Sequence, residues 1–278
     1  MSTKPPPPPP IPTCASLKEV VDALESVIDW SIKVPSRLGY FAALYKRITV
    51  AVDTAIKQGA FDDGPRMERF DAAFASRYLD ALNGFFHPSQ FPRPTRSWQK
   101  TFDAVDRADL IILQHMLAGM NAHIALDLGI TAQNIAPATK LPALHHDFNT
   151  INAVLASQVN GLVDDINQLS PELAELYQVL AENEIFLIDQ AVAAMRDSAW
   201  RFAVLLAVVP GVIRPFTILA RDRQVAAQAD LIYRPPGIIG LIDATIREIV
   251  KTESRDVVRN IRVLAEIAST PAPIKTTL

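Results

Sequence analysis

Glycine is scarce in this chain, with only 10 among 278 residues. Because glycine marks turns, bulges and phosphate-binding loops, this scarcity argues against a β-rich fold and against a glycine-rich nucleotide cradle. Neither G-x-G-x-x-G nor G-x-x-x-x-G-K-[ST] occurs anywhere in the sequence. The low glycine content therefore favours a helical protein that does not use these nucleotide-binding loops.

Cysteine, an excess of positive charge and long apolar runs are also lacking. A single cysteine, Cys14, excludes a disulfide framework and a cysteine-based zinc site. Lysine and arginine total 27 against 30 acidic residues, which leaves no basic excess to neutralise nucleic-acid phosphates. The most apolar stretch, residues 202–220, is interrupted by Pro210, Arg214 and Pro215, so it predicts a buried helix and no transmembrane segment. We expect a soluble, cytoplasmic, globular protein that binds no nucleic acid.

Apolar residues recur with helical period from about residue 16 onward, and the alternation typical of strands is not sustained anywhere. Proline, glycine and capping residues divide this region into about eight helices. These are expected from a capping box at Ser16, over 36–59, from Phe70 to Phe86, and over about 97–128 (ended by Gly129), 144–169, 171–209, 215–232 and 238–268. The sequence predicts an all-α fold, with a single globular bundle over residues 16–278.

Proline is concentrated at the N-terminus, where seven of the 21 prolines lie in the first twelve residues. The unbroken run from Pro5 to Pro10 favours an extended polyproline II conformation without a core of its own. We therefore expect residues 1–15 to form a disordered proline-rich tail. Two roles for this tail stay open: a spacer, or an interaction peptide for an SH3- or WW-type partner.

A polar stripe interrupts the apolar sequence of the helix expected over 97–128. His123 and Asp127 are four residues apart and share a face, and His115 lies eight residues before His123. Buried imidazole and carboxylate groups cost free energy unless they pair or bind something. With Asp147 of a later helix, these residues are candidate ligands for a divalent metal (zinc, iron or manganese), and His123, Asp127 and Asp147 are candidate catalytic residues. The alternative is a structural network in which the carboxylate orients the imidazole.

Further residues extend this candidate site. Arg196, a fourth candidate catalytic residue, can hold a carboxylate or phosphate, or can pair with Asp189 two turns earlier. Gly119 lies inside a helix one turn before His123, which predicts the close approach of a ligand or of a neighbouring helix backbone. The candidate substrate-binding residues are Trp98, Met116, Met120, Asn121, Asn152 and Trp200.

Three motifs, taken in order, resemble a known family. They are Gly119-Met-Asn121-Ala-His123-Ile-Ala-Leu-Asp127-Leu-Gly129, Asp147-Phe148-x-x-Ile151-Asn152 and Arg196-x-x-Ala199-Trp200. Over about residues 38–210 the chain is similar to uncharacterised all-helical proteins of bacteria and fungi that are catalogued as a domain of unknown function. This resemblance implies a fold and no established activity. A second likeness, to zinc-dependent phospholipase C and P1-type nucleases, rests on His123 and Asp127, and no Pro-x-His follows that pair.

The sequence leaves two functions open. The first is a small-molecule enzyme that acts on an apolar substrate, such as a lipid, terpenoid or polyketide, by non-redox cyclisation, isomerisation or hydrolysis. In that enzyme the His/Asp region would hold a metal that acts as a Lewis acid. Without a metal, the same groups would act as a general acid and a general base, because burial would give them different pKa values. The second is a non-catalytic ligand-binding or scaffold protein, in which the same residues form a buried structural network.

Overall fold

The structure, a computed structural model, describes residues 6–170, 188–234 and 240–268. All regular structure in these ranges is helical, which confirms the predicted all-α class. The α-helices are α1 (Leu17–Lys33), α2 (Leu38–Lys57), α3 (Gly64–Phe86), α4 (Arg96–Asp103), α5 (Ile112–Ala122), α6 (Gly129–Ile135), α7 (Leu141–Leu169), α9 (Ile188–Val208), α10 (Arg214–Tyr233), α11 (Gly240–Thr252) and α12 (Val257–Ala268). A π-helical segment, His123–Leu128, joins α5 to α6.

The described part of the chain already has more helices than the eight or so expected, because two of the expected long helices are divided. The helix expected over 97–128 is broken between α4 and α5, and it then continues past Gly129, which was expected to end it. A Cβ atom on Gly129 would lie 2.6 Å from the carbonyl oxygen of Ala199, so this glycine permits the close packing of α6 on α9. The helix expected over 238–268 is divided into α11 and α12. The helix start expected at residue 171 lies outside the described residues.

Local sequence signals account for two of the helix starts. At α1, Ser16 accepts a hydrogen bond from the backbone N–H of Glu19, and the Glu19 carboxylate accepts one from the N–H of Ala15. The first of these bonds is the one that the predicted capping box requires, whereas Glu19 binds the N–H of Ala15, one residue before the N-cap, and not that of Ser16. At α3, the Asp63 side chain accepts from the N–H of Arg66, and so satisfies one of the free donors of the first turn.

The proline-rich N-terminal segment is docked on the helices from residue 6 onward. Burial recurs at every third residue, Pro8, Ile11 and Cys14, as the threefold period of a polyproline II helix requires. The backbone N–H and C=O of Ile11 both bond to the side-chain amide of Asn83 on α3, at 2.8 Å each. The expectation of a disordered tail is therefore corrected for this segment, because its backbone and apolar side chains have partners in the fold.

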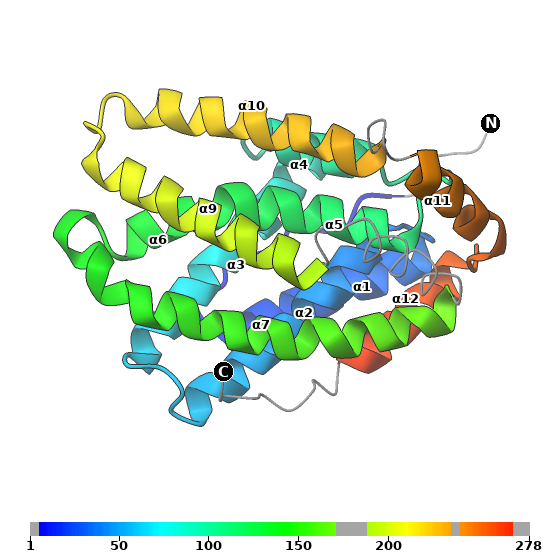
Figure 1. Ribbon diagram of the computed structural model, residues 1–278, viewed down its shortest axis with the longest axis horizontal. Helices are drawn as coiled ribbons and strands as arrows, with labels where there is room; N and C mark the ends of the chain where they lie inside the picture. The colour runs from blue at the N-terminus through cyan, green and yellow to red at the C-terminus, as the bar shows by residue number, and fades with distance from the viewer. Residues whose placement is uncertain (1–5, 171–187, 235–239, 269–278) are drawn as a thin grey trace.

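The helices are arranged around α2, which packs against α1, α3, α5, α7 and α12 (Figure 1). α9 and α10 run in opposite directions from a turn at one end of the molecule and diverge away from it, and we call this pair of helices the α9–α10 hairpin (Figure 1). α9 packs on α6, α7 and the π-helical segment, while α10 packs on α4, α5 and the same segment. The π-helical segment thus lies between the hairpin and the central helices. No helix in the described ranges is long and apolar enough to cross a membrane.

Candidate functional site

The π-helical segment His123–Leu128 carries the two central residues of the predicted site. π-Helical segments are rare in proteins, and those that occur often lie at functional sites. All six of its residues are buried. Just before it, a Cβ atom on Gly119 would lie 2.5 Å from the ring of Phe41. The close approach predicted at Gly119 is therefore made by an aromatic side chain of α2.

Asp127 is a buried carboxylate that holds three neighbouring side chains. Arg77 Nε donates to Oδ1 at 2.6 Å, Trp98 Nε1 donates to Oδ2 at 2.7 Å, and His123 Nδ1 lies 3.4 Å from Oδ2. Burial alone would raise the pKa of Asp127, but Arg77, His123 and Trp98 together lower it below its ordinary value. Asp127 therefore remains ionised and orients the His123 ring.

The His123 ring is fixed by aromatic contacts on several sides. It stacks on Phe74, with ring centroids 3.6 Å apart, and lies edge-on to Tyr45 at 4.6 Å. Burial lowers the pKa of His123, although Asp127 opposes this shift, so the ring is neutral near pH 7. Because Nδ1 faces the ionised Asp127, the proton lies on Nδ1 and the lone pair on Nε2. Nε2 is buried and has no hydrogen-bond partner among the described residues.

His123 lines a cavity of about 40 Å³, which has room for about three water molecules. Its walls come from α2, α3, α5, the π-helical segment, α7 and α9. Most lining side chains are apolar, among them Phe41, Val52, Phe70, Met120, Ile151 and Leu155. Three polar side chains, Tyr45, Asp71 and Arg196, line the same cavity as His123. The cavity thus combines an apolar wall with a small set of polar groups.

Asp71, on α3, is the acidic residue that lines this cavity, and its pKa is strongly shifted. It is only 4% exposed, and its Oδ2 atom has no hydrogen-bond partner in the described part of the chain. Burial raises the pKa of Asp71 to about 7, although Arg196 opposes the shift. The Tyr45 hydroxyl is likewise buried without a partner there, and burial raises its pKa. Near neutral pH the cavity therefore holds a partly protonated carboxyl group together with a neutral imidazole.

Arg196 reaches the cavity from α9. Its Nε donates to Asn152 Oδ1, its Nη2 donates to the carbonyl of Phe148 at 2.6 Å, and its guanidinium lies 4.5 Å from the centre of the Phe148 ring. Burial lowers the pKa of Arg196 to about 9, so it still carries a positive charge at pH 7. This charge favours ionisation of Asp71. The side chain of Asp189, the alternative partner considered from the sequence, lies outside the described residues.

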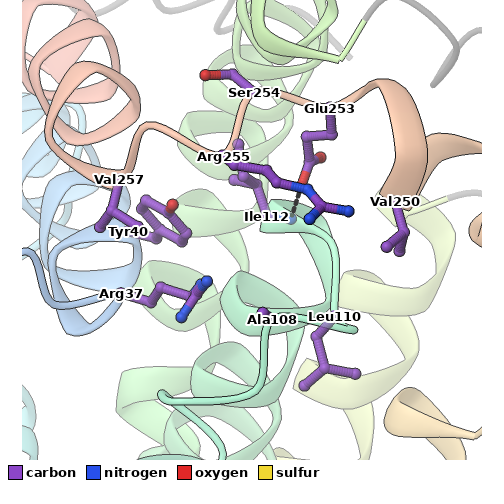
Figure 2. A pocket seen from close by; sticks show the side chains of 10 residues that line it. All are labelled: Arg37, Tyr40, Ala108, Leu110, Ile112, Val250, Glu253, Ser254, Arg255 and Val257. Carbon is purple, nitrogen blue, oxygen red and sulfur yellow. Dashed lines mark hydrogen bonds between the residues drawn. The ribbon is translucent and has the colours of Figure 1, made fainter.

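His115 lies apart from His123 and Asp127. Its ring packs edge-on against Tyr40, with centroids 6.0 Å apart, and burial lowers its pKa to about 4. Tyr40 lines a separate pocket of about 20 Å³. Figure 2 shows that this pocket also has Ile112, the first residue of α5, in its lining. There the Glu253 carboxylate accepts a hydrogen bond from the backbone N–H of Ile112 at 2.9 Å. This carboxylate caps α5.

Asp147 ties α7 to the loop before α3. It is fully buried and accepts hydrogen bonds from the backbone N–H groups of Asp62 (2.7 Å) and Asp63 (3.1 Å). Arg66 Nη2 also donates to it, at 2.7 Å. The Asp147 carboxylate is therefore already occupied in holding the chain.

The structure does not bring the four predicted metal ligands, His115, His123, Asp127 and Asp147, together at one point. Of the residues described, only Asp62, His146 and Asp147 form a group of three or more potential ligands close enough for one ion. Asp127 and Asp147 are each bonded to an arginine, Arg77 and Arg66 respectively.

The predicted substrate-binding residues are dispersed. Met120 lines the cavity, and Asn152 borders it through Arg196. Trp98 binds Asp127, Met116 is buried in the core, Asn121 donates to the carbonyl of Val225 at 2.9 Å, and Trp200 packs on His145 and Phe148.

A wider groove, of about 340 Å³, lies next to Asp127. It is lined by Arg77, Asp80, Phe91, Arg93, Trp98 and Asp127, among others. Burial raises the pKa of Asp80. The carboxylate of Asp127 therefore borders this groove, while its partner His123 lines the cavity.

Sequence reasoning missed Asp71 and Tyr45. A signal for each was present, because each interrupts the apolar face of its own helix. Asp71 follows Phe70 and precedes Phe74 by three residues, and Tyr45 lies four residues after Phe41. A polar atom at such a position has to find a partner or a ligand.

Comparison with known proteins supports the first of the two resemblances. A family model described as a family of unknown function (DUF5995) matches residues 17–235, a range that contains all three motifs. The likeness to phospholipase C and P1-type nucleases is not supported. No curated protein and no solved structure matches the chain. With most of its length matched, the chain belongs to DUF5995, a family of unknown function.

Proposed function

We propose that the cavity beside His123 is a proton-transfer site for the reacting end of a small apolar substrate. One observation carries this proposal. His123 Nε2, Asp71 Oδ2 and the Tyr45 hydroxyl all belong to side chains that line one cavity, and none of these atoms has a hydrogen-bond partner in the described part of the protein. A buried polar atom without a partner costs about 1–3 kcal/mol. Three such atoms at one apolar cavity therefore favour a ligand that satisfies them.

The protonation states of these groups suit an isomerisation. Neutral His123 accepts at Nε2 a proton from the carbon next to a carbonyl group, and Asp127 stabilises the imidazolium that forms. Asp71, in its protonated form, donates a hydrogen bond to the carbonyl oxygen, where negative charge develops. In a β,γ-unsaturated carbonyl compound, loss of this proton gives a dienolate, and His123 then returns the proton to the γ-carbon. The C=C double bond has moved into conjugation with the carbonyl group, no electrons are gained or lost, and both side chains regain their initial state.

The size of the cavity limits the substrate. Ligand pockets usually measure about 300–1,000 Å³, whereas this cavity measures about 40 Å³. A whole lipid, terpenoid or polyketide does not fit such a space. The proposal therefore concerns a carbonyl group of a small molecule, or the end of a longer one.

Proton exchange tests this proposal without knowledge of the natural substrate. Small ketones, from acetone upward, are incubated with the protein in D2O, and the loss of the proton beside the carbonyl is followed by NMR. We expect exchange above the buffer rate, a fall of about 100-fold or more in His123→Gln, and about tenfold in Asp71→Asn. His115→Gln is the matched control, because this second buried histidine lies outside the cavity. Equal exchange by the wild-type protein and His123→Gln would contradict the proposal.

Ligand binding without turnover is the second candidate function. The observation that favours it is the network around Asp127, in which both carboxylate oxygens have donors and hold His123 in place. In that case a small ketone would shift the NMR resonances of His123 while its own protons exchanged no faster than in buffer.

A further inference from the structure

The turn of the α9–α10 hairpin exposes an unusual number of apolar side chains. Eight large apolar residues of the described chain are exposed, and seven of them lie between residues 204 and 219. We call these seven the apolar tip: Val204, Leu205, Val208, Val212, Ile213, Phe216 and Leu219. Val208, Val212 and Phe216 are 74%, 81% and 70% exposed. Such a concentration of exposed apolar side chains in one short segment, in place of single scattered ones, marks an interaction surface.

The two helices of the hairpin carry the same pattern in mirror order. On α9 the exposed Arg201 comes seven residues before Val208, and on α10 the exposed Arg223 comes seven residues after Phe216. At a rise of 1.5 Å per residue, each arginine lies about 10 Å along its helix from the apolar residue nearest the turn. The apolar tip is thus bordered on both helices by a positive charge at the same depth.

The charge of the hairpin is opposite in sign to that of the whole chain. No aspartate or glutamate occurs between Asp197 and Asp222, although the chain has a net charge of −3. Asp222 is itself buried, and it accepts hydrogen bonds from the backbone N–H groups of Arg96 and Ser97 at the start of α4. Between residues 198 and 221 all charged residues are arginines, so this stretch is positive, and the exposed Asp197 lies one helical turn farther from the tip than Arg201.

We propose that the apolar tip docks on the surface of a bilayer that contains anionic lipids. Its apolar side chains enter the interface, and Arg201 and Arg223 meet the phosphate groups. Interfacial helices bury their apolar residues about 5–10 Å deep, which agrees with the spacing between these arginines and the turn. Basic residues near such a surface add attraction to anionic lipids. The chain lies on the membrane through this hairpin and does not cross it there.

A second copy of the chain fits the same surface less well. In a symmetric dimer the same patch faces itself. Two apolar tips packed side by side would bring Arg201 and Arg223 of one copy toward those of the other, and like charges repel. A lipid surface instead offers apolar chains and anionic groups in layers, in the order that the hairpin presents.

The inner face of the hairpin is separate from the apolar tip. Phe202, Leu206 and Val225 pack on Ala125 and Leu126 of the π-helical segment. Exposed tip residues can therefore be replaced without opening this core, so a variant that loses binding while keeping its helical spectrum reports on the surface alone.

Vesicle sedimentation of the full chain tests the proposal. The vesicles contain either phosphatidylcholine alone or equal parts of phosphatidylcholine and phosphatidylglycerol. We expect the wild-type chain to prefer the anionic vesicles, and Val212→Ser combined with Phe216→Ser to lower the partition coefficient about tenfold or more. Arg201→Gln combined with Arg223→Gln should lower binding to anionic vesicles about tenfold and leave little preference for them. Leu231→Ser is the matched control, because Leu231 is an exposed apolar residue of α10 outside the tip.

Each other outcome would overturn the proposal. Absence of vesicle binding by the wild-type chain is one, and equal binding by the Val212→Ser/Phe216→Ser variant and Leu231→Ser is another. Light scattering without lipid separates the second copy from the membrane. If the wild-type chain is a dimer that does not sediment with vesicles, and the Val212→Ser/Phe216→Ser variant is a monomer, the tip is a self-association surface instead.

Discussion

Two buried aspartates, Asp147 and Asp71, show how differently one residue type is used in this protein. Asp147 is fully buried and accepts two backbone hydrogen bonds and one from Arg66. Asp71 is nearly as buried, yet one of its oxygens has no partner within the described chain, and it lines a cavity with His123. A carboxylate with all its donors in place holds the fold together, whereas one left without them at a cavity is available to a ligand.

Removal of Asp147 should have the largest effect on stability. Asp147→Ala leaves Arg66 and two backbone N–H groups without their acceptor, and breaking such a buried charge pair costs about 3–5 kcal/mol. Urea denaturation measures this loss in the free energy of unfolding. The control is Asp62→Ala, which removes an exposed carboxylate of the same loop and should cost less than about 1 kcal/mol. Similar losses in both variants would show that the Asp147 contacts do not tie α7 to this loop.

The comparison can be sharpened through pH, because Asp71 should oppose folding when it is ionised. Its pKa rises on folding from 3.8 to about 7, so the folded state binds the proton more tightly than the unfolded state does. The resulting stabilisation is complete below pH 3.8 and is lost as the pH rises through 7. Between pH 5 and pH 8, the free energy of unfolding of Asp71→Asn should rise by about 2–3 kcal/mol relative to that of the wild-type protein. Urea denaturation of both proteins at the two pH values measures this difference. A difference between the two proteins that stayed constant with pH would contradict the assignment.

His115 should show the opposite dependence on pH. Burial lowers its pKa from 6.5 to about 4, so between these values the unfolded state binds the extra proton. The resulting stabilisation is present above pH 6.5 and is lost as the pH falls towards 4. Between pH 7 and pH 5 the wild-type protein should lose about 2 kcal/mol that His115→Gln does not lose. Chemical denaturation at both pH values checks this, and an equal loss in both proteins would show that His115 is accessible to protons in the folded state.

The fold was largely predictable because helical periodicity and capping residues are local properties of the sequence. The start of α1 at Ser16 and the loop before Arg96 both follow from such local signals. The break between α4 and α5 was not predictable in this way, since residues 104–111 contain neither proline nor glycine. Nor was the π-helical segment, whose form depends on the helices that pack around it.

The candidate site was predictable only in part. The His123–Asp127 contact follows from a spacing of four residues on one helix. Asp71 and Tyr45 reach the cavity from α3 and α2, and whether their polar atoms find partners depends on contacts between helices that are distant in sequence. Sequence spacing shows which residues share a face, but it does not show which buried atoms remain without a hydrogen bond.

Asn83 provides the smallest test, because it is a neutral counterpart of Asp147. Its amide bonds to both the N–H and the C=O of Ile11, and so holds the N-terminal segment on α3. Since no charge is left behind, Asn83→Ala should cost only about 1–2 kcal/mol. Loss of these bonds should also raise the rate at which a protease cuts between residues 6 and 15, because cleavage there requires the segment to open locally from α3. Unchanged proteolysis in Asn83→Ala would mean that the buried Pro8, Ile11 and Cys14 hold this segment without the amide, and that polar pairing matters less at the edge of this fold than around Asp147.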